Sequence, residues 1–154
     1  MTEIRIAQYF DLLDATNNRY TYQNYFVRQA ATLSGVQYEF APFRAEGSVS
    51  NVGGDNAAIR ILFPSVDYSI RLVERANGNR LSKLTLTSQW LNAAGSQIRI
   101  YEERYIGIGA SFSETTVELR YRSAMDSVQK TFPSRKLTQS LVGSLPLNEQ
   151  LNLQ

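Results

Sequence analysis

Residue types that support catalysis are scarce in this chain. The 154 residues include no histidine and no cysteine, so the commonest general base is missing, and Ser-His and Cys-His catalytic arrangements are excluded. Ser127-Val128-Gln129-Lys130 places a lysine one helical turn after a serine, where it could deprotonate the hydroxyl group. The motifs that accompany this spacing in enzymes, Ser-Asp-Asn and Lys-Thr-Gly, are missing. A solvated helical turn is the simpler interpretation of this segment.

Carboxylates are the remaining candidates for acid–base or metal chemistry. Glu102 and Glu103 are adjacent, so on a strand they would point to opposite faces and would form a poor acid–base pair. Asp11 and Asp14 could share one face of a helix, but nothing nearby in the sequence supplies the other ligands of a metal site. The sequence therefore predicts no catalytic, cofactor or metal site, and we expect that the protein is not an enzyme.

The net charge and the hydropathy of the chain argue against nucleic acid and a membrane as partners. Sixteen basic residues stand against fourteen acidic ones, a formal charge of +2, which is too small an excess for a dedicated nucleic-acid binder. Arg99, Arg104, Arg120 and Arg122 lie on expected strands and could form a local basic patch, or simply a solvated or interfacial strand face. No apolar run approaches the roughly 18 residues of a membrane span, and the first residues do not resemble a signal peptide. We expect a soluble protein made in the cytoplasm, with neither a membrane nor nucleic acid as partner.

The pattern of apolar residues predicts a mainly β (α+β) fold, an antiparallel sheet or sandwich with one short amphipathic helix and extended terminal arms. Val36 to Phe40 alternates apolar and polar residues, as a half-buried strand does. Residues 58–63 are more continuously apolar, which indicates a central strand. After Pro64 a helix is expected, capped by Ser65 or Asp67 and ended by Asn77-Gly78. Three further strands are expected within residues 83–90, 98–108 and 117–122.

These elements suggest three parts: an N-terminal Tyr/Asn-rich arm (1–35), a β-rich core domain (36–135) and a C-terminal leucine-bearing arm (136–154). Aromatic and amide residues of the first arm are typical of an interface, although an edge strand that packs on its own core is an equal alternative. In the second arm Gly143 and Pro146 forbid one long helix. Burial of each leucine is worth roughly 1.5–3 kcal/mol, so we expect this arm to pack on an adjacent subunit or on another protein of the same assembly. The predicted interface residues are Tyr20, Tyr22, Tyr25, Leu141, Leu145, Leu147 and Leu151.

The order of several short motifs resembles a family of short phage tail proteins related to the N-terminal domain of lambda-type minor tail protein L. The motifs are Val-Gln-Tyr-Glu-Phe-Ala-Pro-Phe at 36–43, Ile-Arg-Ile-Leu at 59–62, the helix start Val66-Asp67, and Phe-Pro-Ser-Arg at 132–135 followed by Leu137-Thr138. The resemblance implies a virion component, synthesised in the host cytoplasm. It would be a tail-tip or baseplate ring subunit that adjoins the tail tube and hub and forms a homo-oligomer. Lambda-type protein L also has a cysteine-bearing domain that binds an iron–sulfur cluster, which a chain without cysteine cannot do.

A second function remains open on the residues alone. Tyr20, Tyr22, Tyr25 and Trp90 form an aromatic set, and flat aromatic rings stack on sugars. The alternative to a tail subunit is therefore a β-sandwich carbohydrate- or surface-binding module.

Overall fold

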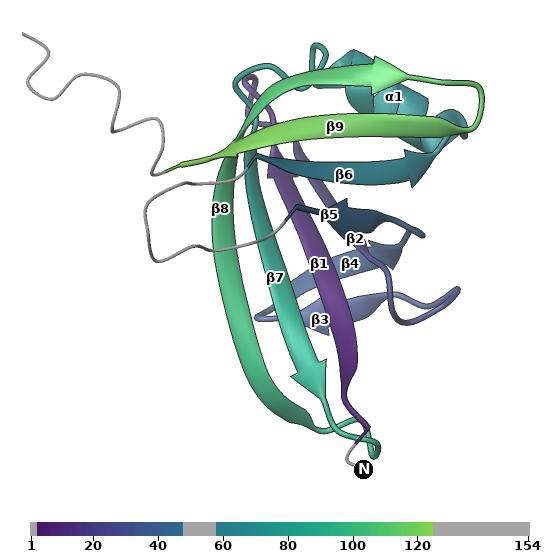
Figure 1. The fold of residues 1–154 in the computed structure, drawn as a ribbon, viewed down its shortest axis with the longest axis vertical. Helices are drawn as coiled ribbons and strands as arrows, with labels where there is room; N and C mark the ends of the chain where they lie inside the picture. The colour runs from purple at the N-terminus through teal and green to yellow at the C-terminus, as the bar shows by residue number, and fades with distance from the viewer. Residues whose placement is uncertain (1–2, 48–57, 125–154) are drawn as a thin grey trace, which may run out of the picture.

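The computed structural model describes residues 3–47 and 58–124, which form a nine-stranded sheet and one α-helix (Figure 1). The strand order is β3-β4-β2-β1-β7-β8-β9-β6-β5. Neighbouring strands are antiparallel except β2 and β4, which pair in parallel. This confirms the mainly β fold with one short helix, built on a single mixed sheet. The elements are β1 (Arg5–Leu13), β2 (Arg19–Gln23), β3 (Ala31–Leu33), β4 (Val36–Phe40), β5 (Arg44–Glu46), β6 (Ile59–Pro64), α1 (Asp67–Arg75), β7 (Lys83–Leu91), β8 (Gln97–Phe112) and β9 (Thr116–Ser123).

The sheet folds over so that one of its faces encloses the main core. β8 belongs to both halves, because it pairs with β7 from Gln97 to Ile106 and with β9 from Tyr105 to Phe112. Figure 1 shows β1, β7 and β8 running along the long axis, while β9, β6 and β5 cross them at one end, where α1 also lies. The core between these layers consists of Phe10, Leu12, Ala41, Phe43, Ile59, Ile61, Phe63, Leu72, Val73, Ala76, Leu84, Leu86, Tyr105, Val117, Leu119 and Tyr121.

A glycine-containing irregularity marks the place where β8 changes partner. The register between β8 and β9 shifts between Gly107 and Gly109, as at a β-bulge, which bends a strand and increases its twist. The buried side chain of Asn79 donates hydrogen bonds from Nδ2 to the carbonyl oxygens of Gly109 (3.3 Å) and Arg120 (3.2 Å). A Cβ atom at residue 107 would overlap the Asn79 carbonyl and the Ser82 hydroxyl. Glycine is therefore required at 107 by the close approach of the loop before β7.

Helix α1 lies close to the expected position, but a different residue caps its start. Val66 is the residue before the first helical position, and its backbone N–H donates to the Ser69 hydroxyl (3.2 Å), so neither Ser65 nor Asp67 supplies the cap. At the other end the Gly78 N–H donates to the Val73 carbonyl (2.9 Å), and Gly78 has φ of 67°. Leu72 and Val73 are buried against the sheet, which stabilises a helix too short to persist alone.

The N-terminal segment differs from the expected arm. β1 lies inside the sheet between β2 and β7, and its Phe10 and Leu12 are completely buried. On its other face Ala7 and Tyr9 pack under the β3–β4 hairpin, where the rings of Tyr9 and Tyr38 meet edge to face at 5.1 Å. Residues 5–33 thus contribute the three strands β1, β2 and β3 to the sheet. The C-terminal arm (136–154) lies outside the described residues.

Candidate functional site

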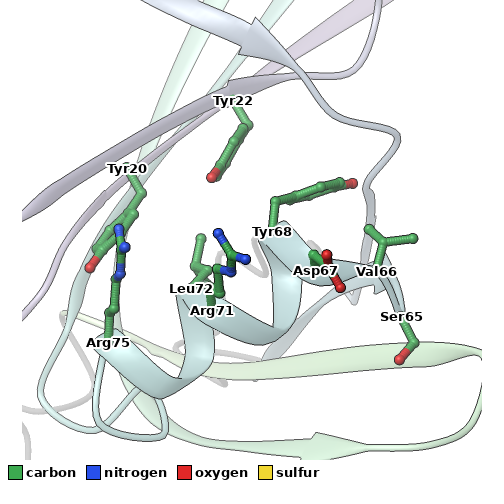
Figure 2. A pocket seen from close by; sticks show the side chains of 9 residues that line it. All are labelled: Tyr20, Tyr22, Ser65, Val66, Asp67, Tyr68, Arg71, Leu72 and Arg75. Atoms are coloured by element: carbon green, nitrogen blue, oxygen red, sulfur yellow. The ribbon is translucent and has the colours of Figure 1, made fainter.

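A cleft of about 860 Å³ separates α1 from β2 (Figure 2). Tyr20 and Tyr22 of β2 form one wall, and residues 65–68, Arg71, Leu72 and Arg75 form the other. Tyr20 and Tyr22 are two residues apart on a strand, so both side chains point to the same face of the sheet. Arg71 and Arg75 are one helical turn apart, so they also share a face. Two short spacings in the sequence therefore build both walls.

The tyrosines of the cleft are wall residues whose rings are already in contact with the core. Tyr22 lies 6.2 Å from Phe10, 6.0 Å from Phe63 and 5.8 Å from Tyr68, measured between ring centroids. The Tyr20 hydroxyl donates to Asp14 Oδ2 at 3.2 Å. Burial raises the pKa of both tyrosines. Both hydroxyls therefore keep their protons at neutral pH; Tyr20 donates its hydrogen bond to Asp14, and the Tyr22 hydroxyl remains available as a donor.

The described lining of the cleft carries two positive charges, Arg71 and Arg75, and one acid, Asp67, which lies one helical turn before Arg71. Arg71 and Arg75 are exposed, and within residues 3–47 and 58–124 neither side chain makes an ion pair or a hydrogen bond. Asp67 is the acidic residue in the lining, at the first position of α1, where a carboxylate stabilises the helix. The described lining therefore presents two cationic side chains and tyrosine hydroxyls, groups that can bind an anion.

A second surface is the far end of β1, β7 and β8, which extends beyond the core. We name this surface the open end and define it by Ile4, Ile6, Ile98, Ile100 and Tyr101. Ile6 is 51% exposed and Ile98 is 54% exposed. The set covers both sides of the sheet, because residues 98 and 100 alternate with 99 and 101 along β8.

On one face of the open end the side chains of Trp90, Tyr101 and Arg99 lie in contact. Ile6 is opposite Trp90 and Trp90 is opposite Arg99, so all three side chains lie on the same face. Trp90 and Tyr101 meet with ring centroids 5.5 Å apart, and the Arg99 guanidinium lies 5.5 Å from the Tyr101 centroid. This is the same face that encloses the core further up the strands, left uncovered at its far end.

The backbone of β8 is also open there. β8 meets β9 only from Tyr105 onward, so along residues 97–102 the described part of the chain places β7 on one side and no strand on the other. An exposed strand edge with apolar side chains is a template for pairing with another chain. The open end thus combines apolar side chains with a strand edge that has no partner within residues 3–47 and 58–124.

The predicted interface residues do not come together. Tyr20 and Tyr22 line the cleft. Tyr25 packs against the buried group formed by Ala7, Tyr9, Tyr38 and Leu91, with its ring centroid 4.9 Å from that of Phe26. Trp90 lies near the open end. The aromatic set behind the carbohydrate-binding alternative is therefore divided among three places. The four predicted leucines, Leu141, Leu145, Leu147 and Leu151, lie outside the described residues.

The position of Tyr25 follows from a buried glutamine that the sequence alone does not single out. Gln23 is completely buried. Its Oε1 accepts hydrogen bonds from the backbone N–H groups of Tyr25 (2.8 Å) and Phe26 (2.7 Å). Its Nε2 donates to the carbonyl oxygens of Phe26 (2.8 Å) and Gln29 (2.9 Å). One side chain thereby organises the whole loop between β2 and β3.

Two of the acidic candidates serve structural roles. Asp11 lies on a strand, not a helix, and pairs with Arg19 (2.6 Å). Asp14 holds the turn between β1 and β2. Burial by itself would raise the pKa of Asp14, but hydrogen bonds from Asn18 and Thr16 outweigh it and lower the pKa to about 2.

The remaining candidates are Glu102 and the Ser127–Lys130 segment. Glu102 forms an ion pair with Arg104 (2.9 Å) on the exposed part of β8. Ser127 and Lys130 lie outside the described residues. No group of three or more metal-binding side chains occurs within the part of the chain that the structure describes, and no helix in that part is long and apolar enough to cross a membrane.

Comparison with known proteins gives a likeness of fold. No protein-family model matches the sequence, and no curated protein matches it either. A chain in the solved structure titled "Virion of native gene transfer agent (GTA) particle" superposes with a TM-score of 0.60 at 12% sequence identity. The match covers 82% of this chain and 43% of that chain, so this chain spans less than half the length of its structural neighbour. The chain is therefore similar in fold to part of a virion protein.

Proposed function

We propose that this protein is a structural component of a phage-like virion and acts by assembly with other protein chains. The observation that carries the proposal is the open end, where apolar side chains occupy both faces of a strand whose edge is unpaired within the described residues. Single exposed isoleucines are ordinary on protein surfaces, but a cluster beside an open strand edge marks an interaction site.

A partner chain at the open end would bury its apolar side chains and pair with its backbone. Burial of one large apolar side chain is worth roughly 1.5–3 kcal/mol. Ile98 and Ile100 lie on the bare half of β8 itself, so a partner strand added to this edge would cover them and satisfy the backbone groups together. Such an interface provides affinity through the main chain and specificity through the side chains on each face.

The more specific role is a tail-tip or baseplate ring subunit that adjoins the tail tube and hub. It is supported by the resemblance of residues 36–138 to short phage tail proteins and by the fold shared with a chain of a gene transfer agent virion. The leucines of residues 141–151 are proposed as further contacts with an adjacent subunit. An image of the whole particle that traces the chain would test this placement.

The assembly proposal can be tested with one double variant and a matched control on the same strand. Ile98→Glu combined with Ile100→Glu places charges on the open end, whereas Ile108→Glu alters an isoleucine of similar exposure (44%) at the bulge. Light scattering coupled to size exclusion should show association of the wild type, alone or with the tube and hub proteins of its particle. The double variant should lose this association, and Ile108→Glu should retain it.

A wild type that stays monomeric at high concentration and in the presence of those partners would refute the proposal. Equal loss of association in the control would show that the open end is not the contact. Thermal melts of all three proteins establish that each variant is folded, since every substituted side chain is exposed.

A further inference from the structure

The cleft between α1 and β2 has a chemistry of its own, separate from the open end. We propose that it binds a carboxylate-bearing peptide segment of another protein, with Arg71 and Arg75 as the groups that hold the carboxylates. The proposal stands on the cleft alone and applies whether or not the protein belongs to a virion.

The first argument is the supply of hydrogen-bond donors. Each guanidinium carries five N–H groups and binds a carboxylate through two of them at once. Figure 2 shows Arg71 on the side of the cleft near Tyr22 and Tyr68, and Arg75 beside Tyr20. Neither arginine is occupied by an acidic side chain of the described residues. Two like charges one turn apart also repel each other, and a bound anion would relieve this repulsion.

The Tyr22 hydroxyl is a third hydrogen-bond donor that supports anion binding in the cleft. The Tyr22 hydroxyl has no hydrogen-bond partner within the described residues, and Figure 2 shows it directed into the cleft towards α1. Because burial raises the pKa of Tyr22, this group keeps its proton and acts as a donor. Donors from two elements thus face one space, while the acid in the lining, Asp67, lies at the start of α1.

The form of the walls favours a peptide over a sugar. Sugars bind by stacking on an open aromatic face, but the Tyr22 ring already contacts Phe10, Phe63 and Tyr68. The Tyr20 hydroxyl is held by Asp14. Leu72, which is buried, provides an apolar floor beneath the two arginines. An apolar floor with cations at its rim suits a peptide whose acidic side chains reach the rim.

The proposal is tested by binding of a fluorescein-labelled peptide of alternating glutamate and glycine, followed by fluorescence anisotropy. The same peptide with glutamine in place of glutamate is the control probe. Arg71→Gln and Arg75→Gln should each weaken binding about tenfold, as expected for the loss of a charge-assisted hydrogen-bonded pair. The control variant Arg80→Gln removes an exposed arginine outside the cleft and should bind like the wild type.

One variant should change the affinity in the opposite direction. Asp67→Asn removes the acid of the cleft lining and should tighten binding of the glutamate peptide severalfold. Binding by the wild type should weaken steadily with salt, because the contact is between charges. In a labelled sample the Nε–H signals of Arg71 and Arg75 should shift on titration, which reports the contact without any substitution.

Three results would overturn the inference. The first is no binding of the glutamate peptide by the wild type up to about 1 mM. The second is an equal loss of affinity for Arg80→Gln and Arg71→Gln, which would indicate a nonspecific charge effect. The third is binding of polygalacturonate at the cleft with no response to the peptide, which would identify an acidic glycan as the ligand.

Discussion

Replacement of Gln23 by leucine should destabilise the protein by about 2–4 kcal/mol. The side chain is completely buried and makes four hydrogen bonds to the backbone of residues 25–29. A net value of about 1 kcal/mol for each bond gives an upper figure of about 4 kcal/mol. Leucine has a similar volume, so the cavity contribution is small. Because Phe26 and Gln29 are exposed, water can reach part of the freed loop backbone and lower the cost.

Urea unfolding followed by circular dichroism measures this change, and the melting temperature should fall by roughly 10 °C for a domain of this size. Gln37→Leu is the matched control, since Gln37 is exposed on β4 and the same substitution there should change stability by less than about 0.5 kcal/mol. The loop between β2 and β3 should also become the most easily cleaved by protease. If Gln23→Leu is as stable as Gln37→Leu, the glutamine does not organise the loop and the reasoning is wrong.

Three further predictions concern the turn at Asp14, the bulge in β8 and the C-terminal arm. Hydrogen bonds outweigh burial and depress the pKa of Asp14 from 3.8 to about 2. The contribution of Asp14 to stability is therefore complete above pH 3.8 and is lost as pH falls towards 2. Asp14→Ala should remove this part of the acid dependence of the urea midpoint. Gly107→Ala should cost about 1–3 kcal/mol, because its Cβ would meet the Asn79 carbonyl. Gly109→Ala, where the nearest atom is 3.6 Å away, should cost much less, and equal costs would contradict the argument. Truncation after Arg135 should leave a cooperative thermal melt but abolish incorporation into particles, and an unfolded or normally incorporated product would disprove the proposed role of the arm.

The pattern of apolar and turn-forming residues over short stretches of sequence predicts two features of the fold correctly. The continuous apolar run 58–63 predicted a central strand, and β6 has both β5 and β9 as partners. The Asn77-Gly78 pair predicted the end of α1, and Gly78 does take the positive φ that such an end requires. Each of these signals depends on residues a few positions apart.

Local sequence patterns do not predict features that depend on residues far away along the chain. Tyr9, Phe10, Leu12 and Leu13 suggest a helical turn by their spacing, yet they lie on β1 because β2 and β7 pair with both of its edges. Ile98 and Ile100 share the parity of Ile106 and Ile108 and so resemble core residues, but the core lies on the face of Tyr105, so they remain exposed. Sequence periodicity identifies the face of a strand and does not reveal whether anything covers that face.

The two surfaces also differ in position, and this bears on how the protein could assemble. Figure 1 shows α1 at one end of the long axis and the N-terminal end of β1, with the β7–β8 turn, at the other. The open end exposes apolar side chains beside a strand edge that is unpaired within the described residues, and the cleft beside α1 exposes Arg71 and Arg75. A two-fold contact formed by the open ends of two subunits would leave the cleft free, because the two surfaces lie at opposite ends of the long axis. Together the two proposals give this protein a different neighbour at each end of its long axis.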